Sequence, residues 1–178
     1  DLIEAMSLWN WLHEDSEIDK NCLVKFHQET FKIYPSNFDP LSITGSQSNG
    51  GRFNIGSPQS DHNFQPPIKM TGCIYAASSV VCANAEIPKP NKFDKTYKIV
   101  PSRELELWDL KCILKKWENI ELEKIIKDSP TAGAWNLQKV PKPSQLVAHF
   151  LRQKGGDGLF FPSTKDSNET VYAFFVDS

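Results

Sequence analysis

Arg52 is the first residue of this chain whose type and setting could support chemistry. It lies in the run Gly50-Gly51-Arg52-Phe53-Asn54, within a polar loop that we expect to extend from Pro35 to about Ile68. Glycine lets the backbone approach a ligand closely and adopt unusual dihedral angles. A guanidinium group offers a fork of hydrogen-bond donors that suits phosphate. The run predicts a binding site for a phosphorylated ligand, with a surface arginine in a flexible loop as the alternative.

Glu86 is the second candidate, because it ends a short predicted helix. Ser78 or Ser79 can cap the start of this helix, and Pro88 stops it. The residues before Glu86, Cys82-Ala83-Asn84-Ala85, are small and leave room for a ligand. A carboxylate here could act on a cation-bearing substrate, and the alternative is a solvated glutamate at a helix end.

Tyr75 and Ser163 are both placed by predicted strands. Tyr75 lies within Gly72–Ala76 among small residues, and Ser163 follows Leu159–Phe161 where a turn begins. A serine that leaves a strand end can point into a cleft, although such serines more often make a local turn hydrogen bond. Tyr75 could equally be an ordinary aromatic residue of the core.

The composition favours a single domain, alone or with an extension. The chain has 178 residues, of which 39% are hydrophobic, and a formal net charge of -2. This balance indicates neither nucleic acid nor a membrane surface as a partner. No apolar run is long enough to span a bilayer, and no secretory signal opens the chain. Because it begins with Asp1 rather than Met, it could be a segment of a longer or delivered protein.

The cysteines and histidines do not predict a metal site. Cys22, Cys73, Cys82 and Cys112 are widely scattered, and no histidine lies at metal-ligand spacing from another histidine or a cysteine. We therefore expect no metal. We expect the four cysteines to be buried free thiols, which indicates a reducing compartment.

Helices and scattered strands together predict a mixed α+β class. The first helix is expected from Leu2 to Trp11, and its Trp9 and Trp11 could contact a partner or pack on the domain's own core. Ser144 is expected to cap a late helix that Gly155-Gly156 ends. The other elements are expected at Leu110–Ile126, as one or two short helices, and as strands at Phe26–Tyr34, Tyr97–Val100, Leu105–Trp108, Leu159–Phe161 and Val171–Val176.

The order of these motifs resembles the RES domain, a family named for its Arg, Glu and Ser. The run from Gly50 to Asn54 matches the family's glycine-arginine-aromatic-asparagine signature. The resemblance extends from about Leu23 to Phe175. Its other matching segments are Ile74-Tyr75-Ala76-Ala77-Ser78, Ala85-Glu86, Trp135, Ser144-Gln145-Leu146-Val147-Ala148 and Gly156-Asp157-Gly158-Leu159-Phe160-Phe161-Pro162-Ser163.

The resemblance implies a fold and a set of site residues. The family is similar to ADP-ribosyltransferase toxins, with split, strongly curved β-sheets and surrounding helices around an NAD cleft. Residues 21–178 would form the RES-like catalytic domain, and residues 1–20 an N-terminal helical extension. Arg52 and Glu86 would be catalytic, and the substrate would be bound by Arg52, Asn54, Tyr75 and Ser163.

The function implied by the resemblance is that of an NAD-degrading toxin. It would cleave the nicotinamide–ribose bond of NAD, as a glycohydrolase or phosphorylase, and would act in the cytoplasm unless an antitoxin or immunity protein restrains it. One alternative is a mono-ADP-ribosyltransferase that modifies a protein, with the loop from Pro35 to Ile68 recognising the acceptor. Another is a non-catalytic nucleotide-binding or interaction domain, which would not need both Arg52 and Glu86.

Overall fold

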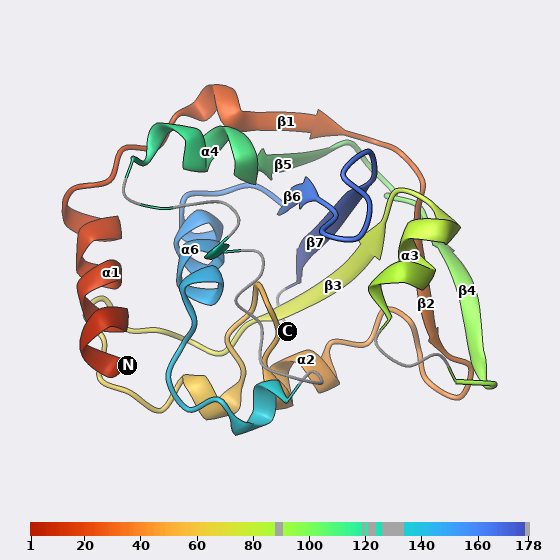
Figure 1. The fold of residues 1–178 in the computed structure, drawn as a ribbon, viewed down its shortest axis with the longest axis horizontal. Coiled ribbons are helices and arrows are strands. Elements are labelled where there is room, and N and C mark those ends of the chain that lie inside the picture. The colour runs from red at the N-terminus through yellow and green to blue at the C-terminus, as the bar shows by residue number, and fades with distance from the viewer. Residues whose placement is uncertain (88–90, 119, 121–123, 126–133, 177–178) are drawn as a thin grey trace.

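Seven strands form one hydrogen-bonded sheet in the order β1-β5-β6-β7-β3-β2-β4. The computed structural model describes residues 1–87, 91–118, 120, 124–125 and 134–176. The strands are β1 Leu23–Phe26, β2 Thr30–Pro35, β3 Gly72–Ala77, β4 Asp94–Ile99, β5 Leu105–Asp109, β6 Gly158–Pro162 and β7 Thr170–Val176. The helices are α1 Leu2–Glu14, α2 Thr44–Asn49, α3 Val80–Glu86, α4 Leu110–Lys116 and α6 Pro143–Gln153 (Figure 1). This is the mixed α+β class that the sequence predicts.

Strands β3 and β7 form the centre of the sheet and divide its side chains between two hydrophobic clusters. Cys73 and Ala77 belong to the larger cluster, together with buried residues of α1, α4 and α6. Ile74 and Ala76 belong to the smaller cluster, which also contains aromatic residues of β1 and β7. Successive residues of a strand point to opposite faces, which explains the alternation. The long helices therefore pack on one face of the sheet.

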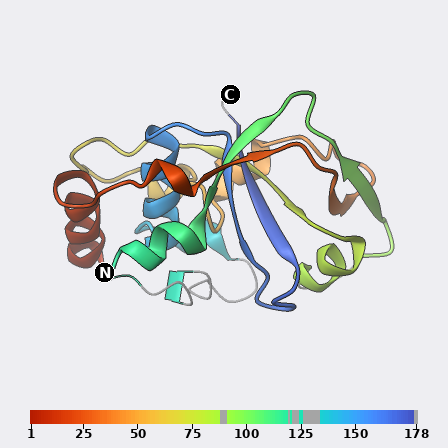
Figure 2. The ribbon, with the colours of Figure 1, turned by 90° about the horizontal axis from the view of Figure 1, so that it is seen from above.

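The junction between β2 and β3 is the weakest connection in the sheet. These strands are joined through the single pair Phe31↔Ala77. By contrast, β2 pairs with β4 over its full length, from Thr30↔Ile99 to Pro35↔Asp94. Strands β2 and β4, together with α3, lie at the end of the molecule opposite to α1 (Figures 1 and 2). All seven strands are thus linked in one sheet, and β2 leaves β3 after one contact.

The N-terminal helix packs against the rest of the fold. Trp9 is 0% exposed and belongs to the larger cluster. Its indole Nε1 donates a hydrogen bond to the carbonyl oxygen of Pro66 at 2.8 Å. Trp11 is half-buried and meets Trp117 edge to face, with ring centroids 5.4 Å apart. Of the two alternatives for Trp9, contact with a partner or packing on the domain's own core, the structure shows the second.

The prediction of four free thiols is wrong for two of the cysteines. Cys22, beside β1, and Cys112, in α4, form a disulfide that spans 90 residues of sequence, whereas Cys73 and Cys82 are free and buried. The two partners are brought together by tertiary packing, so their spacing gave no signal. Disulfides persist in oxidising environments, and the cysteines therefore no longer indicate a reducing compartment.

Three further local predictions differ from the structure. The strand expected over Phe26–Tyr34 is divided into the end of β1 and the start of β2, and the polar loop from Pro35 to Ile68 contains α2. Ser144 does not cap α6, because this helix already begins at Pro143, a residue whose fixed φ suits the first helical position.

Part of the region from Leu110 to Ile126 lies outside the described residues. Across the described residues, no helix is long and apolar enough to cross a membrane.

Candidate active site

Arg52 is held at the tip of a tight turn. We call residues Gly50–Asn54 the arginine turn. The backbone amide of Gly51 donates to the carbonyl oxygen of Asn54 at 3.2 Å, and the reverse bond is 3.4 Å long. Gly50 has a φ of 85°, and a Cβ atom there would lie 2.1 Å from Oε1 of Gln59. Since both the dihedral angle and the lack of space require glycine, the sequence fixes the shape of this turn.

Asn54 and Tyr75 connect the arginine turn to β3. The Tyr75 hydroxyl donates to Asn54 Oδ1 at 2.7 Å and accepts from the Phe53 amide at 3.0 Å. Asn54 is buried, and its Nδ2 donates to the carbonyl oxygens of Ser46 and Thr71. Burial, the largest effect, raises the pKa of Tyr75 well above its usual value, so this phenol stays a neutral donor. Asn54 therefore makes internal bonds here, and a direct contact with substrate remains a prediction.

Glu86 and Ser163 form the second part of the arrangement. Ser79 caps α3 by accepting a hydrogen bond from the Cys82 amide, and Glu86 is the last residue of that helix. The Ser163 hydroxyl donates to Glu86 Oε1 at 2.6 Å. Its oxygen accepts from the amides of Lys165 and Asp166, at 3.1 and 3.3 Å. These two bonds direct the hydroxyl proton toward Glu86 and orient the carboxylate.

A cavity of about 170 Å³ lies where β2 leaves β3. Tyr75 and Glu86 line it directly, among residues of β2, β3 and α3. Ser163 does not line this cavity itself, but it donates a hydrogen bond to Glu86, which does. The full lining is Phe31, Lys32, Ile33, Tyr75, Ala76, Ala77, Ala83, Glu86, Ile87 and Val171. Two of the predicted residues thus meet at one small, mainly apolar cavity.

Arg52 does not line this cavity, but the next residue of its turn, Phe53, donates a hydrogen bond to Tyr75, which does. Burial lowers the pKa of the Arg52 guanidinium, while the nearby Glu86 and Tyr75 act in the opposite direction. The guanidinium carbon also lies 5.9 Å from the centre of the Phe161 ring. At physiological pH an arginine keeps its charge. The charge of Arg52 is therefore placed next to Tyr75, on one side of the cavity that Glu86 also lines.

Lys32 is a candidate that the sequence prediction missed. It lines the cavity from β2, and its Nζ donates to the carbonyl oxygen of Pro40 at 2.9 Å. Burial lowers the pKa of Lys32 to about 8, and Asp39 opposes this shift. The available signal was a lone lysine inside the apolar run Phe31-Lys32-Ile33. It adds a second cation to the site.

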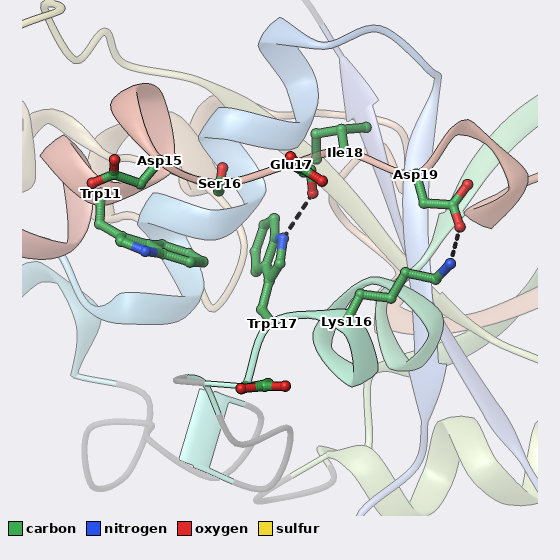
Figure 3. Close-up of a pocket in the computed structure, with 9 residues that line it drawn as sticks. Trp11, Asp15, Ser16, Glu17, Ile18, Asp19, Lys116 and Trp117 are labelled. Carbon is green, nitrogen blue, oxygen red and sulfur yellow. Dashed lines mark hydrogen bonds and ion pairs between the residues drawn. The ribbon is translucent and has the colours of Figure 1, made fainter.

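A larger pocket of about 570 Å³ lies between the end of α1 and α4 (Figure 3). Lys116 forms an ion pair with Asp19, and the Trp117 indole donates to the carbonyl oxygen of Glu17 at 2.9 Å. None of the five predicted site residues, all of which the structure describes, lines this pocket. Its surroundings are rich in carboxylates, which repel an anionic ligand. The residues that line this pocket are Trp11, Asp15, Ser16, Glu17, Ile18, Asp19, Lys116, Trp117 and Glu118.

Comparison with protein families identifies the chain. Residues 27–178 match the model of the RES domain. The chain belongs to the RES family. This confirms the resemblance on which the site residues were chosen, and the match includes Arg52, Tyr75, Glu86 and Ser163 as well as the whole cavity. Helix α1 precedes the matched region.

A solved structure supports the fold. A chain in the crystal structure of the M. tuberculosis MbcT–MbcA toxin–antitoxin complex is similar to this RES protein, with a TM-score of 0.60 and 13% sequence identity. The similarity covers 96% of this chain and 81% of that one. A comparison with curated proteins found no match. At this identity the likeness concerns the fold.

Proposed function

We propose that this RES protein is an NAD-degrading toxin that cleaves the bond between nicotinamide and ribose. The observation that carries the proposal is that Glu86 lines the cavity together with Tyr75 of β3 and Lys32 of β2. Arg52 adds positive charge nearby. Carboxylate and cations around one small cavity suit a substrate that carries both a diphosphate and a cationic ring.

The chemistry makes use of the carboxylate. In NAD the nicotinamide ring is cationic, so breaking its bond to ribose releases a neutral leaving group and needs no strong general acid. Positive charge moves to the ribose, and Glu86 would stabilise it. An electrostatic contact of this kind is worth about 3 kcal/mol in the transition state. Water or phosphate then adds to the ribose, giving ADP-ribose or its phosphate ester.

The other residues would bind and orient the substrate. The cavity of about 170 Å³ is small compared with pockets that enclose a whole ligand, so it would hold the nicotinamide end. Tyr75 would stack on or border this ring. Arg52 and Lys32 would bind the diphosphate by charge-assisted hydrogen bonds. Ser163 would keep Glu86 oriented.

The same proposal covers the architecture and the partner. We assign residues 21–178 to the catalytic domain, with an ADP-ribosyltransferase-like core, and residues 1–20 to an extension that packs on it. The related fold in a toxin–antitoxin complex supports a separate antitoxin or immunity protein as partner. The site of action would be the cytoplasm, where NAD depletion is harmful.

Expression of the domain in cells should lower the NAD level and stop growth. Normal growth and a normal NAD level, with soluble protein present, would contradict a toxin role.

Incubation of the purified protein with NAD tests the proposal. Free nicotinamide should appear without any added protein acceptor, together with ADP-ribose or, when phosphate is present, its phosphate ester. Transfer of labelled ADP-ribose to a protein would instead identify a mono-ADP-ribosyltransferase. Binding of NAD without any release of nicotinamide would indicate a non-catalytic domain.

A further inference from the structure

Gln145 connects α6 to the arginine turn. It is 0% exposed, and its Nε2 donates to the backbone carbonyl oxygen of Asn54 at 2.9 Å. Its Oε1 accepts from the backbone amide of Lys142 at 2.9 Å, just before the helix begins. A buried amide with both ends bonded is fixed in orientation. The last residue of the arginine turn is therefore tied to the start of α6, more than 90 positions away.

Gln59 packs beside Gly50, the first residue of the turn, and is itself held by hydrogen bonds to neighbouring segments. Its Oε1 accepts from the Gly56 amide at 2.9 Å, and its Nε2 donates to the carbonyl oxygens of Trp135 and Gln138, both at 2.7 Å. A Cβ at Gly50 would lie 2.1 Å from Gln59 Oε1 and 3.2 Å from Gln145 Nε2. The side chains of Gln59 and Gln145 thus leave no room for a Cβ atom at Gly50, the first residue of the turn.

We infer that Gln145, supported by Gln59, is a positioning residue that sets Arg52 in place before the substrate binds. The inference rests on the proposed function, since it assigns Arg52 to the substrate. The Asn54 carbonyl that accepts from Gln145 also accepts from the Gly51 amide. The Asn54 side chain accepts from the Tyr75 hydroxyl. A shift of Asn54 would therefore move Arg52 and release Tyr75 together.

Loss of the Gln145 amide should weaken NAD binding without removing any contact to NAD. The apparent affinity falls in proportion to the fraction of molecules that hold the competent turn. Gln145→Met preserves the size of the side chain and leaves the buried Asn54 carbonyl short of a donor. We expect the Kd for NAD to rise about tenfold, the scale of one lost hydrogen bond to a buried group. In turnover the KM should rise more than kcat falls.

Two neighbours on α6 provide matched controls. Val147 is fully buried in the larger cluster, so Val147→Ala should lower the melting temperature by removing core packing. Ser144 is fully buried, and its hydroxyl has no hydrogen-bond partner among the described residues. Val147→Ala and Ser144→Ala should both retain the affinity of the parent protein. Calorimetry in a Glu86→Gln background would measure binding without consuming NAD.

A readout without NAD separates this inference from the proposed function. The amides of Gly51, Phe53 and Asn54 are bonded within the turn or to Tyr75, and their hydrogen exchange should be faster in Gln145→Met than in Val147→Ala. If Gln145→Met does not fold, Gln145→Glu keeps the acceptor for Lys142 and loses the donor to Asn54. Equal exchange and equal affinity in the Gln145 and Val147 variants would overturn the inference. If the wild-type protein does not bind NAD, the proposed function fails and exchange alone decides whether Gln145 positions the turn.

Discussion

The arginine turn and the acid side of the site, Glu86 with Ser163, are held in different ways. The turn is fixed through its backbone by the buried amide of Gln145 from α6, and Gln59 packs beside Gly50 while bonding to the nearby Gly56. Glu86 ends the short helix α3 and is oriented through a side-chain bond from Ser163. Arg52 is therefore positioned by backbone contacts of its turn, whereas Glu86 is positioned by a side-chain hydrogen bond from Ser163. On the proposed function, a backbone-held cation for the diphosphate beside an acid oriented by Ser163 suits a reaction whose charge develops at the ribose.

The largest effect is expected from Glu86→Gln. This change removes the charge and retains the shape, so it should lower NAD turnover at least about a hundredfold while NAD still binds. Nicotinamide release and calorimetry measure the two quantities. The matched control is Glu118→Gln, at the larger pocket between α1 and α4, which should keep wild-type turnover. Near-normal turnover by Glu86→Gln would show that Glu86 is not the catalytic acid.

Arg52→Ala should weaken NAD binding as well as turnover. A charged hydrogen bond to the diphosphate contributes about 1.5–3 kcal/mol, so the Kd should rise roughly ten- to a hundredfold. Arg103→Ala, which removes an exposed arginine paired with Asp157, is the control and should not change the Kd. An unchanged affinity in Arg52→Ala, measured by calorimetry, would show that Arg52 does not bind the substrate. The contrast between the arginine turn and the acid side of the site would then have no functional meaning.

Lys32 should make NAD binding depend on pH. Burial lowers its pKa to about 8, so the ammonium group is charged below that pH and loses its proton as the pH rises through it. The Kd for NAD should therefore rise about tenfold between about pH 7 and 9. Lys32→Arg keeps the charge across this range and should abolish most of the change. The same pH dependence in both proteins would exclude Lys32 as the titrating group.

The smallest effect on the site is expected from Cys22→Ser. The disulfide with Cys112 joins α4 to the segment before β1, and neither cysteine lines the cavity. Its loss should lower the free energy of unfolding by about 2–5 kcal/mol, with an unchanged Kd for NAD. Urea unfolding measures the first quantity. A reductant should destabilise the wild-type protein to the same extent and have no further effect on Cys22→Ser; a wild-type protein insensitive to reductant would contradict the disulfide.

The candidate residues were found from local signals that are weak one by one and from the order of those signals, which resembles the RES family. Arg52 follows glycines that the turn requires, Glu86 ends a capped helix, and Tyr75 lies in a strand of small residues. Lys32 gave a weaker signal, because a lysine in a strand is usually solvated. Gln145 was noted only as part of the matching late helix, because its role depends on a contact with Asn54 across more than 90 residues.

In the fold, too, the elements with a local sequence signal were predicted, and the features that depend on long-range contacts were not. The central strands β3 and β7 were predicted from their apolar composition. The cavity was not, because it arises where β2 departs from β3 after the single pair Phe31↔Ala77. The disulfide between Cys22 and Cys112 was missed for a similar reason: tertiary packing, and not spacing, brings the two thiols together.

A crystal structure of Glu86→Gln with intact NAD tests the central claim most directly. The account predicts that the bond between nicotinamide and ribose lies beside residue 86 in the cavity between β2 and β3, with the diphosphate near Arg52 and Lys32. NAD bound instead in the carboxylate-rich pocket between α1 and α4 (Figure 3), or a cavity left without NAD at saturating concentration, would contradict it.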